Sequence, residues 1–124
     1  MIDRFFVNIL SDDLAASSRF YVETLGMKVH FESDWFIILV NEGRHPFELG
    51  ILKRTSEIVP ESDRQTPQGL MLTFVVEDVE QVYADAQARG LTIVEPPRNL
   101  FYGQRRLLLR DPNGVLIDVS TPSS

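Results

Sequence analysis

The sequence repeats one order of structural patterns twice, and this repeat constrains the fold more than any other feature. In each half, an alternating apolar segment precedes an amphipathic helix pattern, a glycine and further strand patterns. Asp13-Leu14 corresponds to Asp78-Val79, 65 residues later, and Gly26 corresponds to Gly90, 64 residues later. A module of about 60 residues is too small to cover both faces of its own sheet, so we expect two modules to pack together.

The first half predicts a strand, a helix and three further strands. Alternation over residues 2–10 predicts a strand with Arg4, Phe6 and Asn8 on one of its faces. Acidic Asp13 is an N-cap candidate for a helix over residues 13–25, which Gly26 ends. The next strands are expected over residues 27–33, 35–40 and 46–53, followed by a polar linker or mobile loop over residues 54–68.

The second half repeats this order with one weaker strand. A strand over residues 70–76 is followed by a helix that Asp78 caps and that runs to about Arg89. Further strands are expected over residues 91–94, 104–109 and 115–120, with a break at Pro96-Pro97, a turn at Asp111–Gly114 and a fraying tail at 121–124. The chain is thus predicted to be a single domain of two modules, residues 1–53 and 69–124, joined by the linker 54–68.

Composition and charge exclude several classes of protein. The formal net charge is −6, from 12 Lys+Arg and 18 Asp+Glu, and the basic residues are scattered, which argues against a nucleic-acid partner. No apolar run approaches the roughly 20 residues that span a bilayer, and no signal peptide is visible at the start. With no cysteine, thiolate metal sites and disulfides are excluded. We therefore expect a cytoplasmic protein with neither a nucleic-acid nor a membrane partner.

Short motifs at consistent distances carry a resemblance to a known superfamily. They are Val7-Asn8-Ile9, Asp13-Leu14, Phe20-Tyr21, Leu25-Gly26-Met27, Val75–Val79, Gly90 and Arg110–Asp118. In their order and spacing the chain resembles the vicinal oxygen chelate superfamily, which includes glyoxalase I, extradiol dioxygenases and bleomycin- and fosfomycin-resistance proteins. The resemblance implies an α+β fold in which two βαβββ modules form a curved mixed sheet around a cleft. It also implies a homodimer.

The same resemblance allows a test for a metal cofactor. Metal-dependent members hold one divalent ion with His and Glu side chains from four strands. The equivalent positions in this sequence fall on Phe6, Glu48, Met71 and Asp118. Two carboxylates alone would hold a divalent ion weakly, and His30 and His45 lie at none of these positions. We therefore expect no metal cofactor, and any metal that did bind would use Glu48 and Asp118.

The cleft is expected to bind a small molecule. The candidate residues facing it are Phe6, Asn8, Trp35, Ile37, Glu48, Met71, Thr73 and Asp118, with Tyr102 and Arg105 near the rim. Trp35 can stack on a planar or cationic ligand, and packing of Trp35 and Phe36 in the core or in a dimer interface is the alternative. The carboxylates of Glu48 and Asp118 are candidates for ligand binding or acid–base chemistry, and pairing with nearby arginines is the alternative.

Three functions remain open at this stage. The leading hypothesis is a metal-independent protein that sequesters a small aromatic or cationic compound, as antibiotic-resistance relatives do. The alternative is a glyoxalase-like lyase, isomerase or dioxygenase with an atypical metal site. The third is an interaction module whose cleft is filled by its own side chains. Whether the chain is an enzyme, and which compound it binds, does not follow from the sequence.

Overall fold

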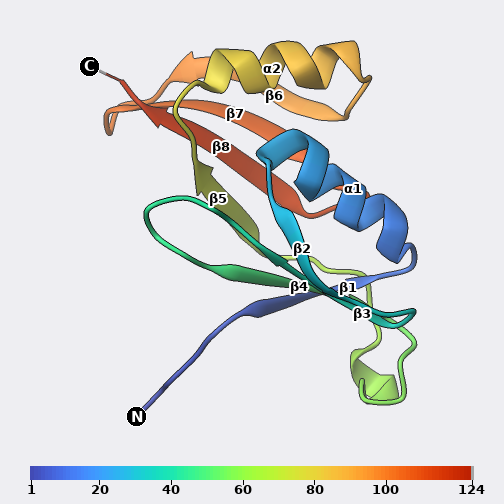
Figure 1. Cartoon of the computed structure of the whole chain (residues 1–124). Coiled ribbons are helices and arrows are strands. Elements are labelled where there is room, and N and C mark those ends of the chain that lie inside the picture. Colours follow the sequence, from blue (N-terminus) through green and yellow to red (C-terminus); the bar gives the residue numbers. More distant parts are fainter. Residues whose placement is uncertain (124) are drawn as a thin grey trace. The chain divides into compact units, whose positions relative to one another are not determined.

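A computed structural model describes residues 1–123 and divides the chain into two compact units, Met1–Pro67 and a second unit that begins at Gln68 (Figure 1). The first unit contains β1 (Val7–Ser11), α1 (Leu14–Leu25), β2 (Lys28–Glu32), β3 (Phe36–Val40), β4 (Glu48–Lys53) and a short 3₁₀ helix (Glu61–Asp63). The second contains β5 (Met71–Val75), α2 (Val79–Ala88), β6 (Ile93–Asn99), β7 (Gln104–Arg110) and β8 (Leu116–Pro122).

Each unit has the predicted βαβββ order and builds one four-stranded mixed sheet. The strand orders are β1-β4-β3-β2 and β5-β8-β7-β6. In both sheets the first strand pairs in parallel with the last, and the other pairs are antiparallel. The predicted α+β class and the twofold repeat are confirmed. Neither described helix is long and apolar enough to cross a membrane.

The first helix covers one face of the first sheet. Asp13 caps α1 by accepting a hydrogen bond from the Ala16 N–H at 3.0 Å, and Gly26 ends it with a positive φ of 71°. A hydrogen bond of 2.8 Å between the hydroxyls of Ser11 and Ser17 joins β1 to the helix. The core lies between helix and sheet and includes Ile9, Phe20, Tyr21, Ile37, Leu39, Leu49 and Ile51, all buried.

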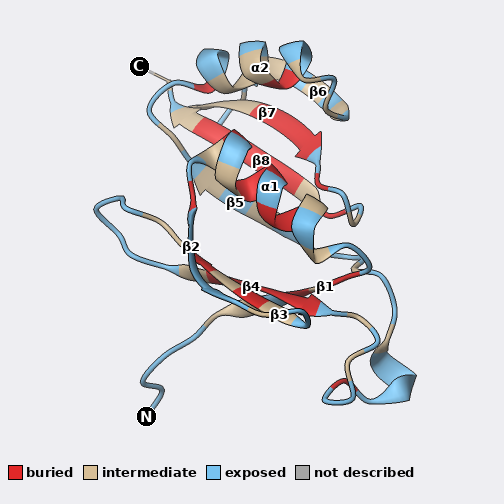
Figure 2. Cartoon of the chain, turned by 45° about the vertical axis from the view of Figure 1, so that its right-hand side comes forward, coloured by how far each residue is buried: buried red, intermediate tan, exposed pale blue. Residues whose placement is uncertain are grey.

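The second unit repeats this arrangement, and its last strand extends to Pro122. Asp78 caps α2 by accepting hydrogen bonds from the N–H groups of Glu80 and Gln81. The Thr121 hydroxyl accepts from the Val79 N–H at 3.0 Å and donates to the Val76 carbonyl at 3.1 Å. The expected fraying of residues 121–124 is therefore wrong for Thr121 and Pro122, which belong to β8, while Ser124 lies outside the described residues. Buried segments of β7 and β8 appear in red in Figure 2.

The predicted break at Pro96-Pro97 is also wrong, because β6 continues through both prolines. The register of β6 against β7 shifts between Glu95 and Arg98, so the prolines occupy an irregular stretch of a strand at the edge of its sheet. Edge strands and bulges are where a sheet tolerates the missing N–H of proline.

The segment expected to be a linker or mobile loop is largely folded onto the first unit. Arg64 donates hydrogen bonds to the carbonyls of Val59 and Ser56, and Arg54 donates to the Arg64 carbonyl and to Asp12. Val59 is buried. These arginine side chains replace the regular backbone ladder that the segment lacks.

Candidate functional site

Among the described residues of the first unit, no helix covers the face of the sheet opposite α1, and this face carries the chemically informative side chains of the unit. Side chains alternate between the two faces of a strand, and directly paired residues share a face. Asn8 pairs with Gly50, and Glu48 pairs with Val40. Phe36 pairs with Leu52 and lies on the same face. We call this surface the open face of the first unit.

Four aromatic side chains form a cluster on and beside this open face, with Phe36 at its centre. The Phe36 ring centroid lies 6.5 Å from that of Phe6, 6.2 Å from that of Phe31 and 5.5 Å from that of Trp35. The Trp35 and Phe36 rings are stacked, at an interplanar angle of 26°. Trp35 and Phe31 remain 40% and 46% exposed, so the cluster presents apolar ring surface to solvent.

A charged pair borders the aromatic cluster. Arg4 donates from Nε to Glu48 Oε2 at 2.6 Å and from Nη2 to Glu48 Oε1. The Arg4 guanidinium also lies over the Phe6 ring, 4.9 Å from its centroid. The hydrogen bonds from Arg4 hold the pKa of Glu48 below its usual range, against the opposing effect of partial burial, and the charge of His30 lowers it further.

Asn8 can lie over residue 50, near the Phe36 ring, because residue 50 has no side chain. A Cβ placed on Gly50 would lie 2.0 Å from Asn8 Oδ1 and 3.1 Å from Phe36 Cε1. The Asn8 carboxamide therefore occupies the space over Gly50, which the Phe36 ring also approaches. This arrangement offers a hydrogen-bonding group next to ring surface, which is the usual composition of a small-molecule site.

Among the described residues of the second unit, no helix covers the face of the sheet opposite α2, and the chemistry of this face differs from that of the first. Asp118 is 4% exposed and accepts hydrogen bonds from Thr73 Oγ1 at 3.0 Å and from Ser120 Oγ at 2.5 Å. Arg106 on the same face donates from Nη2 to Glu95 at 3.2 Å, and hydrogen bonds from Arg98 and Arg106 hold the pKa of Glu95 below its usual range. Both oxygens of Asp118 thus already accept from neighbouring side chains.

Most of the predicted site residues fall into two groups, one on each unit. The remaining ones lie at other positions than predicted. Phe6, Asn8, Trp35 and Glu48 lie on or beside the open face of the first unit, with Trp35 and Glu48 near opposite ends of the β3–β4 pairing. Met71, Thr73 and Asp118 share one face of the second sheet. Arg4, Phe31 and Phe36 complete the first group and were not among the predicted site residues, although the alternation in residues 2–10 already placed Arg4 on the side of Phe6 and Asn8.

Three predicted placements differ from the structure. Ile37 faces α1 and is buried, because the turn at Ser33 puts Phe36 rather than its neighbours on the open face. Arg105 lies on the helix-covered side of the second sheet, where it pairs with Glu80 of α2 and donates to Asn99. Tyr102 lies at the turn between β6 and β7, where its ring meets that of Phe101 edge to face.

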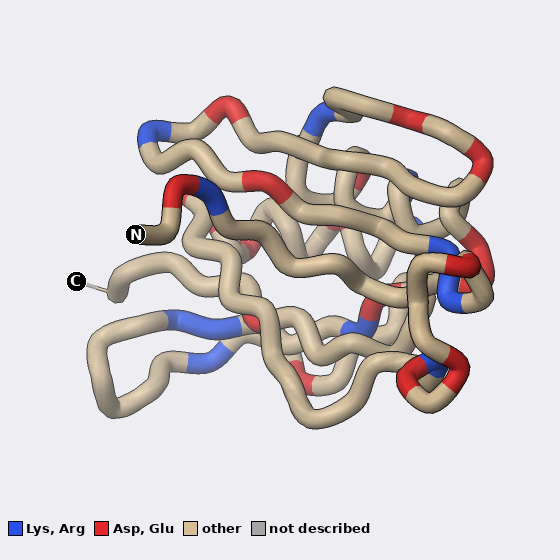
Figure 3. The backbone as a smooth tube through the Cα atoms, turned by 90° about the horizontal axis from the view of Figure 1, so that it is seen from below, with Lys and Arg blue, Asp and Glu red and all other residues tan. Residues whose placement is uncertain are grey.

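Elsewhere among the described residues, acidic and basic side chains are interspersed (Figure 3). Ion pairs join Lys28 to Glu42 and Arg98 to Glu95. Figure 3 shows basic and acidic residues interspersed along the backbone. The Arg4–Glu48 pair differs from these because it lies against an aromatic ring.

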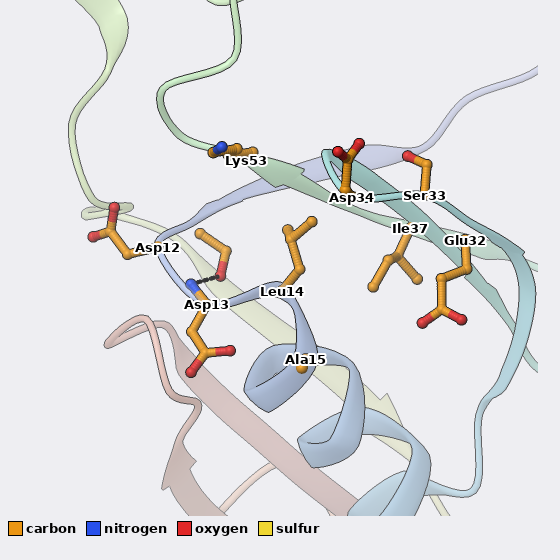
Figure 4. A pocket seen from close by; sticks show the side chains of 10 residues that line it. Asp12, Asp13, Leu14, Ala15, Glu32, Ser33, Asp34, Ile37 and Lys53 are labelled. Atoms are coloured by element: carbon orange, nitrogen blue, oxygen red, sulfur yellow. Dashed lines mark hydrogen bonds between the residues drawn. The ribbon is translucent and has the colours of Figure 1, made fainter.

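A pocket of about 370 Å³ lies elsewhere in the first unit, at the start of α1 (Figure 4). Figure 4 shows Asp12 and Asp13 on one side of it and Glu32 and Asp34 on the other. Asp12 pairs with Arg54, and Asp13 caps the helix. The sequence analysis missed this pocket, but two of its four carboxylates already serve the local fold.

The residues at the superfamily's metal positions do not fit a divalent ion. Phe6 has no ligand atom, the thioether of Met71 is a poor ligand for a hard cation, and Glu48 gives both of its oxygens to Arg4. Within residues 1–123, no group of three or more His, Cys, Asp or Glu side chains is arranged to hold a metal ion. No chemical step can therefore be assigned to a metal at these positions.

Comparison with known proteins decides the family. The model of the Glyoxalase/Bleomycin resistance protein/Dioxygenase superfamily matches residues 2–119. The chain belongs to this superfamily. Membership agrees with the resemblance found in the sequence and with the two βαβββ units of the structure.

Two solved structures share the fold of the chain over nearly its whole length, and a sequence relative matches most of it. A Sphaerobacter thermophilus member of the superfamily has a TM-score of 0.78 at 22% identity, with 98% of each chain covered. Virulence protein STM3117 from Salmonella typhimurium has a TM-score of 0.76 at 26% identity, also with 98% of each chain covered. Uncharacterized protein YraH from Bacillus subtilis is 27% identical, covering 91% of this chain and 93% of its own length.

Proposed function

We propose that this superfamily member binds a small planar aromatic compound on the open face of its first unit, without a resident metal ion. The observation that carries the proposal is the cluster of Phe6, Phe31, Trp35 and Phe36 beside Asn8 and the Arg4–Glu48 pair. Exposed rings offer stacking surface, while the carboxamide and the charged pair offer directional contacts. The biological role proposed is sequestration, as in the resistance proteins that give the superfamily part of its name.

Two features support binding over metal-assisted catalysis. Glu48 is engaged by Arg4, and Asp118 accepts from two hydroxyls, so both carboxylates already have partners within their own units. In addition, two of the four metal positions hold Phe6 and Met71, which supply neither an imidazole nor a carboxylate. The glyoxalase-like or dioxygenase alternative would require Glu48 to leave Arg4 for a metal.

Tryptophan fluorescence tests the proposal directly, because Trp35 is the only tryptophan in the chain. Titration of the metal-free protein with phenazine, quinoline and bleomycin should give saturable quenching for at least one planar compound. Replacing the central ring, Phe36→Ala, should weaken that binding about three- to tenfold, the range expected for one lost aromatic contact. Phe101→Ala removes an exposed ring of the second unit and is the matched control.

Two results would contradict the proposal. One is that no compound in the panel gives saturable quenching. The other is turnover of hemithioacetals or catechols that depends on an added divalent ion and is lost in Glu48→Gln, which would establish the enzymatic alternative.

A further inference from the structure

The Arg4 guanidinium contacts both elements that a protein uses to recognise a planar cation. One is a carboxylate that accepts through two oxygens, Glu48, and the other is an aromatic face, Phe6. A bidentate carboxylate selects planar groups with parallel N–H donors, and a ring face attracts positive charge. Guanidinium and amidinium groups have both properties.

We propose that Phe6 and Glu48 form a recognition site for the amidinium or guanidinium group of a ligand, and that Arg4 occupies this site as an intramolecular ligand. The proposal rests on the proposed function and names its ligand class, which is a planar aromatic cation. The ring of such a ligand would lie over Phe36, whose centroid is 6.5 Å from that of Phe6. The head group would replace the Arg4 guanidinium.

Arg4 is placed where it can be displaced. The strand pairing of β1 begins at Val7, so Arg4 lies ahead of the backbone ladder. Its neighbours Ile2 and Phe5 are 82% and 77% exposed, and the Arg4 side chain itself is 54% exposed. Ion pairs this exposed contribute little to stability, so a ligand cation with additional ring contacts can compete with Arg4.

Arg4 is the basic side chain that forms an ion pair with Glu48. Lys28 on the same sheet pairs with Glu42 instead. His30 affects Glu48 through its charge, whereas both hydrogen bonds to the Glu48 carboxylate come from Arg4. Removal of Arg4 should therefore expose a carboxylate beside a ring, rather than transfer Glu48 to another strong partner.

The test compares two probes of the same shape, cationic 2-naphthamidine and neutral 2-naphthamide, by calorimetric titration. Arg4→Ala should bind 2-naphthamidine about two- to fivefold more tightly than the wild type, the scale of a displaced exposed ion pair, with 2-naphthamide unchanged. Glu48→Gln should bind both probes equally. Lys28→Ala makes the same change in net charge on the same sheet, and it should not alter the preference between the probes.

The outcomes separate this inference from the proposed function. Binding of 2-naphthamide to the wild type, with no selective gain of 2-naphthamidine in Arg4→Ala, would overturn the inference and leave the aromatic site standing. An equal gain for both probes, or the same gain in Lys28→Ala, would also overturn it. If neither probe binds any variant, both proposals fail.

Discussion

At the scale of single residues, Gly50 determines how Asn8 lies on the open face. Because a Cβ at this position would approach Asn8 Oδ1 to 2.0 Å, we expect Gly50→Ala to destabilise the fold by about 1–3 kcal/mol, as overpacking does. Urea unfolding measures this change. Asn8→Ala in the same chain should recover part of the loss, giving a coupling above roughly 0.5 kcal/mol. Strictly additive effects would contradict the close approach of the two residues.

Glu48 should titrate below the ordinary glutamate range. Since Arg4 lowers its pKa in the folded state, its contribution to stability is present above the unfolded pKa of about 4.3 and is lost as the pH falls through the folded pKa. Arg4→Ala should raise the pKa of Glu48 toward that ordinary value. NMR titration of the carboxyl carbon measures the shift, and Lys28→Ala is the control. An unchanged Glu48 pKa in Arg4→Ala would contradict the ion pair.

Asp118 is expected to act in the fold of the second unit rather than as a ligand group. Asp118→Ala leaves two hydroxyls without their acceptor, so we expect a loss of about 1–3 kcal/mol in the free energy of unfolding. Asp118→Asn should lose less, because its carboxamide oxygen still accepts one hydroxyl. Asp34→Ala, at an exposed position, serves as the control. Unfolding indistinguishable from the wild type would leave Asp118 free for another role.

Sequence alternation predicted the sheet face of some candidate residues correctly and that of Ile37 wrongly. It put Arg4, Phe6 and Asn8 on one face, because a strand alternates regularly once its first residues are assigned. It placed Ile37 on the wrong face because the Ser33 hydroxyl, which accepts from the N–H of Phe36, starts the next strand in a different phase. The ion pair of Arg4 joins residues 44 positions apart, and local patterns carry no information on such a contact.

At the scale of elements, both helices follow their sequence signals closely because their caps are local hydrogen bonds. Asp13 and Asp78 occupy the N-cap positions that were predicted from the acidic residues alone. The extent of β6 and β8 was not predicted, since it depends on pairing with β7 along most of their length. Propensity signals such as Pro96-Pro97 are weaker than this tertiary pairing.

The connection between β8 and α2 provides a prediction at this scale. Thr121 accepts from the first N–H of α2 and donates to the Val76 carbonyl, so Thr121→Val should destabilise the second unit by about 1–2 kcal/mol. Thermal unfolding followed by circular dichroism measures the loss. Thr55→Val changes an exposed threonine of the first unit and should have little effect. Equal stability of the two variants would show that this hydroxyl does not hold the helix.

At the scale of the whole molecule, the fold followed from the repeat, whereas the function did not. Order and spacing of short motifs identify a duplicated βαβββ chain because they reflect a topology that many sequences share. The proposed binding chemistry depends on a few side chains, and one of the most informative, Arg4, lies ahead of the first strand. The homodimer and the cytoplasmic location stay predictions.

The central claim is that the open face of the first unit binds an aromatic ligand without a metal ion. The most direct measurement is an NMR titration of the protein in EDTA with 2-naphthamide, observing the side chains of Phe6, Asn8 and Trp35 and, for comparison, the helix-covered Leu39. We predict that the first three shift with one common affinity, that Leu39 does not, and that zinc in place of EDTA leaves the affinity unchanged. Binding that appears only after zinc is added, or shifts confined to other residues, would contradict the claim.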